Sequence, residues 1–539
     1  MVAGSYDVVV LGSGIAGLAA ALAAHECGLA PVVIEKADKL GGTTCDSYGL
    51  IWVGDNHLMR AIGGGDSRAK IIDYMTFLGG GEISESRMLA LVDRSPETLR
   101  FFEQCGIPFR LIQGIVDHYA GIAPGAGVPG RTVEAELISG LELGDWRHKV
   151  RTPKEAPCFV TAEEQIAWGG INRFSFWDRD VVSERRAKDI RGKGVGLVTH
   201  FVKALLERAV PILTNEQTDR LSLADGRVDG VVLAGERKLA ARKGVVIATG
   251  GYEWNADLMQ DFDRLPRLEP LSPPSLTGDG LILGAEIGAA IRRIQNNLNL
   301  MLGFTLVTDA HAQDPIPCLA GISEMCSPHT IVVNKGGQRF ADESYFQSVV
   351  PALRKFDTLQ HTYTNLPCFL IFDAQYAASY ALAHLPIGTK VPQSVERSDS
   401  LSELAHKLGI DPDGLVHSVE RFNGFARAGI DEDFHRGDIQ WRLAKSSTPS
   451  QANSKLGTIE KPPFYGLELH PSLGTSSAGL LTNEYAQVIH QRRRPIPGLY
   501  ASGVAAARTE LGAGYQAGLN LASGMTFSYL AIQHMLNRA

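Results

Sequence analysis

The residues whose type and spacing point most directly to chemistry lie at the start of the chain. Three glycines, in Gly12-Ser13-Gly14-Ile15-Ala16-Gly17, directly follow the apolar run 6–11 and precede the alanine- and leucine-rich stretch 18–24. Glycines at such a turn allow backbone N–H groups and a helix N-terminus to approach a pyrophosphate. A second apolar run, 31–34, ends at Glu35, whose carboxylate can accept hydrogen bonds from an adenosine ribose. These residues predict a dinucleotide site and by themselves fit NAD as well as FAD.

Near the other end of the chain, Gly512-Ala513-Gly514 precedes a helix-like stretch at 518–530. Backbone N–H groups ahead of a helix lie at its positive end and can stabilise an anion such as an enolate oxygen. The N–H of Gly514 is therefore predicted to donate a hydrogen bond to a developing enolate. Two glycine segments suited to negative charge thus enclose nearly the whole chain.

The elements that must position these segments alternate between strands and helices. An amphipathic helix is predicted at 197–210, followed by a strand at 211–214. Asp225-Gly226 between two apolar runs predicts a β-hairpin. The buried-strand run 243–247 ends in Thr249-Gly250-Gly251, and we expect it to return the chain to the first sheet beside the cofactor.

The composition changes along the chain and indicates an insertion. From about residue 293 to 463 the sequence shows mixed strands, polar loops and many aromatics, whereas a strand-to-glycine turn at 497–503 and the last helix restore the first pattern. The predicted fold class is α/β with two domains. Residues 1–292 and 464–539 are expected to form a discontinuous Rossmann-like nucleotide domain, and residues 293–463 an inserted α+β substrate domain.

The overall composition excludes several classes of function. The 539 residues, 44% of them hydrophobic, carry a net charge of −7, which offers no basic stripe for a nucleic acid. No run reaches the roughly 18 apolar residues of a membrane span, and the early first strand leaves no room for a signal peptide. The seven cysteines include no CxxC pair, so neither a metal site nor a disulfide framework is expected. A cytoplasmic protein with a small-molecule partner and no integral membrane segment is predicted.

Six segments, taken in order, resemble the superfamily of FAD-dependent 3-ketosteroid dehydrogenases and fumarate reductases. The resemblance extends over most of the chain and implies a flavoprotein that binds FAD, not NAD. For Asp279, capping of the following helix is an equal alternative to cofactor contact. The segments are 12–17 with Glu35, 41–44, 248–251, 277–280, 331–343 and 498–503. The residues expected to bind FAD are Gly12, Gly14, Ala16, Gly17, Glu35, Lys36, Gly41, Gly42, Thr43, Thr44, Ala248, Thr249, Gly250, Asp279, Gly503 and Leu519.

Within that superfamily the chain resembles the ketosteroid dehydrogenase branch more than the fumarate reductases. Fumarate reductases place an arginine shortly after the Arg-Phe-x-x-Glu segment, whereas the segment here continues Ser344-Tyr345-Phe346-Gln347-Ser348. The place expected for their clamping arginine is occupied by Glu510. A dicarboxylate would therefore meet a like charge, at a cost on the order of 4 kcal/mol for a separation of about 4 Å at an effective dielectric of about 20.

By this resemblance, two tyrosines are candidates for catalytic proton transfer. Tyr119, in Asp117-His118-Tyr119, matches the family's active-site tyrosine segment, and Tyr345 falls where the family has a second tyrosine, proposed as the base. A free phenol has a pKa near ~10, so a basic tyrosine needs a donor, a cation or a helix dipole. His118 is one candidate for that assistance. Packing in a core or at a rim is the structural alternative for both tyrosines.

Glu510 occupies the position of the family's third tyrosine. In the family, that phenol and the backbone N–H that matches Gly514 hold the substrate carbonyl oxygen. An ionised Glu510 cannot donate a hydrogen bond, so either it is protonated, or Tyr515 replaces it, or the substrate sits differently. A loop residue paired with Arg508 is the structural alternative.

These features imply an FAD-dependent oxidoreductase that acts on CH–CH groups. The expected reaction is α,β-desaturation of a cyclic ketone, a 3-ketosteroid or a smaller cyclohexanone, by α-proton abstraction and β-hydride transfer to flavin N5. A quinone, a dye or O2 would be the external electron acceptor. Arg508 or Arg131 is a candidate to contact a substrate carboxylate. The alternatives are a flavin-dependent reductase of an unsaturated acid or ketone, and an electron-transfer flavin subunit without its own organic substrate.

Overall fold

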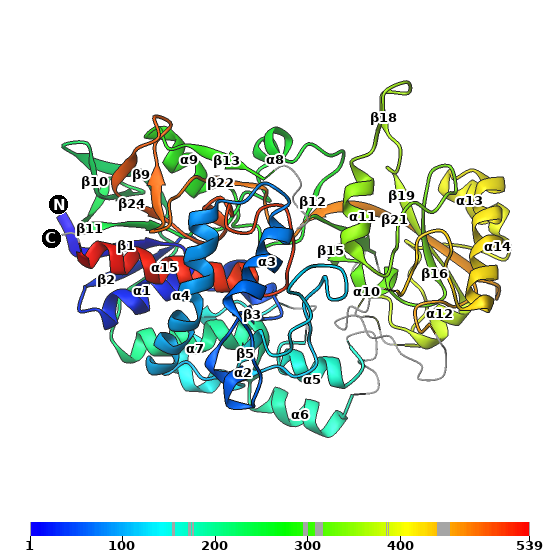
Figure 1. The fold of residues 1–539 in the computed structure, drawn as a ribbon, viewed down its shortest axis with the longest axis horizontal. Helices are drawn as coiled ribbons and strands as arrows, with labels where there is room; N and C mark the ends of the chain where they lie inside the picture. Colours follow the sequence, from blue (N-terminus) through cyan, green and yellow to red (C-terminus); the bar gives the residue numbers. More distant parts are fainter. Residues whose placement is uncertain are drawn as a thin grey trace.

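The chain forms two lobes that lie side by side, each built around its own sheet (Figure 1). Both termini lie at the outer end of the first lobe (Figure 1). The computed structural model describes residues 2–153, 157–170, 174, 177–294, 300–307, 316–383, 385, 387–438 and 453–537.

The first lobe contains an eight-stranded sheet whose central strands are parallel. Two antiparallel strands, β9 (Thr218–Ala224) and β10 (Arg227–Leu233), extend it beside β11. The other strands run in the order β23 (Gln487–Ile489), β24 (Pro495–Ala501), β11 (Arg237–Ile247), β1 (Val2–Leu11), β2 (Pro31–Glu35) and β8 (Ile212–Thr214).

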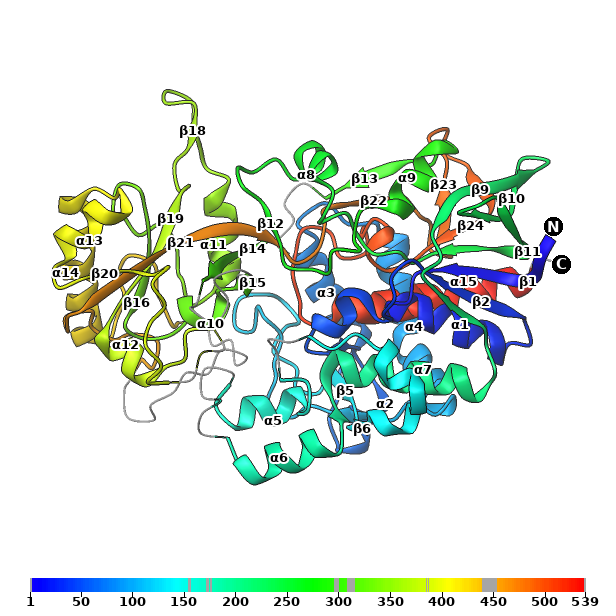
Figure 2. The same cartoon turned by 180° about the vertical axis from the view of Figure 1, so that it is seen from behind.

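This sheet is covered on both faces, as a parallel sheet requires. Alternate residues of β1 enter separate apolar cores, Val8 on one face and Val9 on the other. The core that contains Val8 is filled by helices, of which α15 (Leu519–Asn537) lies beside β1 in both views (Figure 1, Figure 2). The others include α1 (Ile15–Glu26), α4 (Glu85–Gln104) and α7 (Lys193–Glu207).

Several predicted elements are confirmed. Asp225-Gly226 joins β9 to β10, and both residues have positive φ, +50° and +74°, as a tight hairpin turn requires. The amphipathic helix is α7, which begins four residues earlier than predicted, at Lys193. The buried run at 243–247 is the end of β11, parallel to β1 and β24.

The second lobe is built on a seven-stranded sheet, and its central strand corrects a predicted boundary. β21 (Phe464–Leu473) pairs with strands of the second lobe on both sides, so the chain leaves this lobe after Leu473 and not at 464. β12 (Glu269–Pro270) also pairs with β21, so the lobe takes in chain before 293. The other strands are β14 (Leu300–Leu306), β15 (Ile316–Ala320), β16 (Thr330–Asn334), β19 (Cys368–Asp373) and β20 (Glu396–Ser398).

The outer face of this second sheet is covered by α13 (Leu401–Leu408) and α14 (Pro412–Ala428) (Figure 1). No helix within the described ranges combines the length and the apolar character that crossing a bilayer requires. The remaining α-helices described are α2 (His57–Ala61), α3 (Arg68–Gly79), α5 (Ala162–Ala167), α6 (Arg179–Ala187), α8 (Ala256–Phe262), α9 (Asp279–Glu286), α10 (Ile322–Met325), α11 (Phe346–Leu353) and α12 (Ala374–Ser379).

Candidate functional site: a nucleotide cavity and two buried tyrosines

A cavity of about 1010 Å³ opens at the carboxyl ends of β1, β2 and β11 and reaches α10 of the second lobe. We call it the nucleotide cavity. Of the sixteen residues predicted to bind FAD, all but Gly17, Gly41 and Leu519 line it. Those three support the lining: Gly17 and Gly41 pack against the turn, and Leu519 is the buried first residue of α15.

The glycine turn after β1 is built for close backbone approach. Gly12 has a φ of +100°, and a Cβ there would lie 2.4 Å from the Ala248 carbonyl oxygen. A Cβ on Gly17 would lie 1.9 Å from the Gly12 carbonyl oxygen. Gly14, at the cap position of α1, lines the cavity, and the Ile15 N–H that follows it donates to the Thr44 hydroxyl at 3.0 Å. The turn therefore fits a pyrophosphate at a helix N-terminus.

Glu35 and Asp279 both take defined positions in the cavity wall. The Glu35 carboxylate accepts hydrogen bonds from the Ser13 N–H, at 3.0 Å, and the Ser13 hydroxyl, at 2.6 Å, and thereby joins the end of β2 to the glycine turn. Asp279 contacts the Lys36 ammonium at 2.7 Å, while Gly278 occupies the cap position of α9. Gly278, and not Asp279, is thus the cap residue of α9, and contact of Asp279 with the cofactor stays a prediction.

Tyr119 and Tyr345 lie together, although neither lines the nucleotide cavity. Their ring centroids are 5.8 Å apart at an interplanar angle of 88°. Both side chains are buried, and neither hydroxyl has a hydrogen-bond partner of ordinary geometry among the described residues. Tyr515 connects them to the cavity, because it lines that cavity and packs edge-on against His118, whose ring centroid is 5.1 Å away.

The electrostatic surroundings of the two phenols differ from the expected assistance. Burial raises the pKa of Tyr119, and the Tyr515 N–H and the Tyr345 hydroxyl partly offset that rise. Burial and the neighbouring Tyr119 raise the pKa of Tyr345. Burial lowers the pKa of His118 to about 3, so the imidazole is neutral and supplies no positive charge. His118 therefore supplies no cation beside Tyr119, and its assistance as a hydrogen-bond donor stays a prediction.

Glu510 and Gly514 are already engaged by other parts of the protein. Glu510 is buried and accepts hydrogen bonds from the Arg87 guanidinium, at 2.7 and 2.9 Å, and from the Ser523 hydroxyl. The Gly514 N–H donates to the Leu78 carbonyl at 2.7 Å. Neither residue lines the nucleotide cavity, so in this structure neither is placed to hold a substrate carbonyl. Residues of α3, α4 and α15 supply the partners of both groups, and the predicted roles stay predictions.

The two arginines considered for a substrate carboxylate also lie outside the cavity lining. Arg131 is buried between two carboxylates, Asp66 and Asp117, each at 2.8 Å. Asp117 also accepts a hydrogen bond from the Trp52 indole at 2.8 Å, so Arg131 fixes the segment that carries Tyr119. Arg508 is buried and contacts the Ser476 carbonyl at 3.2 Å.

Comparison with known proteins decides the family. The sequence matches the FAD binding domain family over residues 7–524. The chain belongs to this family. It is a flavoprotein whose cofactor is FAD and an FAD-dependent oxidoreductase, and its predicted resemblance to the ketosteroid dehydrogenase superfamily is confirmed.

Three relatives illustrate the similarity. The chain is 35% identical to 4-oxocyclohexanecarboxylate 2-dehydrogenase of Sinomonas cyclohexanicum, over 98% of this chain and 92% of that protein. It is 31% identical to 3-oxosteroid 1-dehydrogenase of Mycolicibacterium smegmatis, over 98% of this chain and 96% of that protein. The crystal structure of 3-ketosteroid delta1-dehydrogenase from Sterolibacterium denitrificans matches with a TM-score of 0.89 and 28% identity, over 99% of this chain and all of that one.

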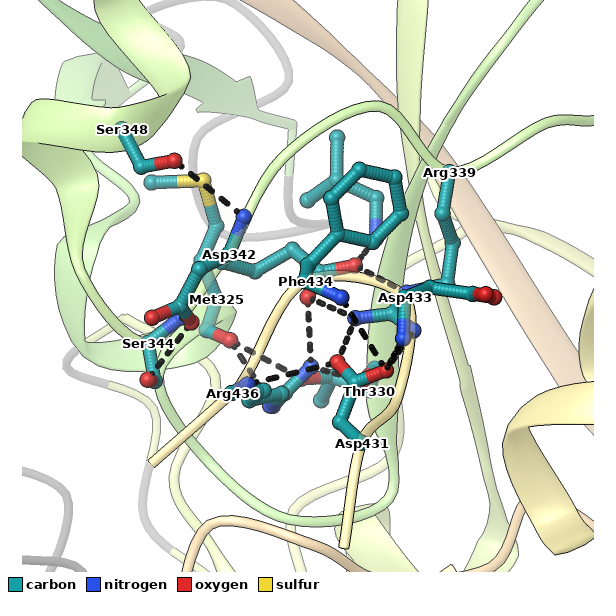
Figure 3. Close-up of polar contacts among 12 residues, drawn as sticks. Met325, Thr330, Arg339, Asp342, Ser344, Ser348, Asp431, Asp433, Phe434 and Arg436 are labelled. Carbon is teal, nitrogen blue, oxygen red and sulfur yellow. Dashed lines mark hydrogen bonds and ion pairs between the residues drawn. The ribbon is translucent and has the colours of Figure 1, made fainter. Parts of the chain in front are cut away.

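A buried charge network in the second lobe of the flavoprotein positions Tyr345. Arg339 contacts Glu343 and Asp431, each at 2.8 Å, and Arg436 contacts Glu343 at 3.2 Å. Figure 3 shows Arg436 reaching Met325 and Thr330, and it donates to their carbonyl oxygens at 3.1 and 2.8 Å. Although burial opposes it, the two arginines hold the pKa of Glu343 below its usual value. The network thus ties the segment before Tyr345 to the end of α10.

Among the polar residues of the cavity wall that were not identified from the sequence are Tyr48, Gln165, Lys193 and Glu324. Tyr48, Gln165 and Lys193 form one connected group, in which the Tyr48 hydroxyl accepts from Gln165 at 2.8 Å and Lys193 donates to Gln165. Glu324, on α10, is buried and accepts from the Ala383 N–H at 2.8 Å. Burial raises the pKa of Glu324 to about 7. A sequence signal for Lys193 was its place between two glycines, Gly192 and Gly194, four residues before the predicted helix.

Proposed function

We propose that this flavoprotein desaturates a cyclic ketone of the cyclohexanone type to the α,β-unsaturated ketone. The observation that carries the proposal is the pair of buried phenols, Tyr119 and Tyr345, whose hydroxyls lack ordinary partners and adjoin the nucleotide cavity through Tyr515. Buried polar groups without partners are costly, and they persist where function uses them. The similarity to enzymes named as dehydrogenases of a cyclohexane ring and of 3-oxosteroids supports the same reaction class.

Desaturation requires removal of a proton from the α-carbon and of a hydride from the β-carbon. Bound FAD supplies the two-electron acceptor for the hydride. In the proposed mechanism the reactive pair of Tyr119 and Tyr345 consists of one phenolate and one phenol. The phenolate takes the α-proton, and the phenol donates a hydrogen bond to the phenolate. Such a pair titrates as a unit. Tyr119 is the phenol that ionises first, because the Tyr345 hydroxyl stabilises its anion.

The carbonyl oxygen also needs a donor, because negative charge develops on it as the α-proton leaves. Tyr515 is proposed for this role. It lines the cavity, lies beside the segment 118–119, and burial raises its pKa to about 12, so its hydroxyl keeps the proton at neutral pH. Tyr515 would thus replace the family's third tyrosine, whose position is occupied here by Glu510. Regeneration of the oxidised flavin is assigned to an external quinone, dye or O2.

The test is an anaerobic titration of the FAD-loaded protein with ketones, followed by flavin absorbance. We expect rapid bleaching by substituted cyclohexanones and recovery of the absorbance when a dye or quinone is added. A steroid such as androst-4-ene-3,17-dione is the comparison substrate. Bleaching by the steroid alone would overturn the proposed ring class. Bleaching by no ketone would overturn desaturation and favour the reductase or the electron-transfer subunit.

A further inference from the structure

The cationic side chains of the nucleotide cavity differ in whether a carboxylate is paired with them. Three of them line the cavity in the described part of the chain: Lys36, Arg151 and Lys193. Lys36 is paired with Asp279 at 2.7 Å, and Arg151 is paired with Asp46. Lys193 has no carboxylate within contact distance among the described residues. One cation of the cavity wall therefore lacks a counter-ion there.

Lys193 is nevertheless held in one position. Its side chain is buried, with the whole residue only 8% exposed. The ammonium donates to the Pro157 carbonyl at 2.8 Å and to the Gln165 amide oxygen, and it lies 5.1 Å from the centroid of the Tyr48 ring. Both acceptors are neutral, so these contacts orient the ammonium without balancing its charge. The Gln165 amide is itself fixed through the Tyr48 hydroxyl.

Burial of an ammonium without a counter-ion is costly unless a partner arrives. The cost is visible in the pKa of Lys193, which burial lowers to about 7. Cys158 and Glu134 are the ionisable groups whose fields reach it. The Glu134 carboxylate, however, accepts from the Ala162 N–H at 2.6 Å at the start of α5 and makes no ion pair with Lys193. An anion that entered the cavity would restore the charged form, because a nearby opposite charge favours it.

We infer that Lys193 is the binding group for a carboxylate on the substrate, so that the substrate class is a cyclic ketone bearing an acid group. This inference rests on the proposed function and adds the feature that selects among its ketones. A neutral steroid offers no counter-ion, whereas a small oxo acid balances the charge of Lys193. Glu324 in the same wall opposes this less than an ordinary carboxylate would, since burial raises its pKa to about 7.

The experiment compares the wild-type holoenzyme with Lys193→Met, Lys193→Arg and the control Lys203→Met, which removes a partly exposed lysine of the same helix. Binding of cyclohexanecarboxylate, which has no ketone to oxidise, is followed by the change in flavin absorbance. Turnover is measured with 4-oxocyclohexanecarboxylate and its methyl ester.

For Lys193→Met we expect the Kd of cyclohexanecarboxylate and the KM of the keto acid to rise about 30-fold or more, because a buried charge loses its partner. The methyl ester should change by less than about threefold. Lys193→Arg should recover much of the binding, and Lys203→Met should match the wild type.

Equal losses for acid and ester would overturn the inference, because they would indicate a structural role. Loss of FAD from Lys193→Met would overturn it too, since the lysine would then serve the cofactor. Failure of the two proposals is distinguishable. If no ketone bleaches the flavin but cyclohexanecarboxylate binding depends on Lys193, desaturation fails and the carboxylate site stands. If the ester is desaturated as well as the acid and Lys193→Met changes neither, the site fails and desaturation stands.

Discussion

At the scale of single residues, the proposed chemistry depends on two phenols that lie edge to face at 5.8 Å. Replacement of Tyr119 or Tyr345 by Phe removes one hydroxyl and leaves the ring in place. Because general acid–base groups contribute about 100- to 10,000-fold, each variant should lower kcat by at least about 100-fold. FAD content and thermal midpoint should stay near the wild-type values. Substantial activity in both variants would contradict the assignment of the proton to this pair.

The pH profile gives a second test at the same scale. Burial raises the pKa of Tyr119, so the phenolate is the minor form at neutral pH, and kcat/KM should rise with pH by up to tenfold per unit. The Tyr345 hydroxyl acts to lower the pKa of Tyr119. The residual activity of Tyr345→Phe should therefore need a higher pH than the wild type. The measurement is kcat/KM between about pH 6 and 10, and a profile that falls with pH would exclude a phenolate base.

At the scale of elements, Arg87 and Glu510 join α4 to the loop before α15. The pair is buried, Ser523 of α15 completes it, and the Arg87 guanidinium lies 3.7 Å from the centroid of the Phe527 ring. Arg87→Met would leave a buried carboxylate unpaired and should cost about 3–5 kcal/mol in the free energy of unfolding. Glu510→Gln keeps the shape and should cost less.

Both variants should retain kcat per FAD-loaded molecule, because neither residue lines the cavity. The measurements are denaturant unfolding and turnover normalised to FAD content. If Glu510→Gln abolished turnover without loss of stability, Glu510 would be a catalytic residue, as its position in the family segment first indicated. The interpretation of the pair of Arg87 and Glu510 as structural would then be wrong.

At the scale of the whole molecule, the free energy of unfolding should depend on pH through its buried acids. Burial raises the pKa of Glu324 from 4.5 to about 7. Between these values the unfolded state releases a proton that the native state keeps, so the free energy of unfolding falls as pH rises, by about 3 kcal/mol at most. Below pH 4.5 and above pH 7 the titration of Glu324 adds no further change in the free energy of unfolding with pH.

Glu324→Gln removes that titration. Relative to the wild type, the variant should therefore be more stable at pH 8 than at pH 5, whatever its absolute stability. Urea unfolding at the two pH values, with FAD in equal excess, measures the difference. Glu432→Gln, at an exposed position, is the matched control and should show no such change. The raised pKa would be contradicted if the stability of the variant relative to the wild type were the same at both pH values, or higher at pH 5 than at pH 8.

The sequence by itself determined the features that short segments encode. The glycine turn at Gly12, the hairpin at Asp225-Gly226 and the last helix follow from local sterics and periodicity, since a residue with positive φ or a close backbone contact is specified by its neighbours. That thirteen of the sixteen residues predicted to bind FAD line one cavity follows from a general rule, because the carboxyl ends of parallel strands meet at one edge of a sheet. The tyrosine pair was predictable only through the family segments.

Only the tertiary structure decided the pairings between distant segments. Glu510 meets Arg87 across 423 positions of the chain, and the Gly514 N–H meets Leu78, so both groups have partners that their local motif did not indicate. β21 joined the second sheet because its strand neighbours are set by the whole fold and not by its composition. Lys193 stood out only when the counter-ions of Lys36 and Arg151 were known. Partners of buried charges are chosen by packing, which a linear pattern does not contain.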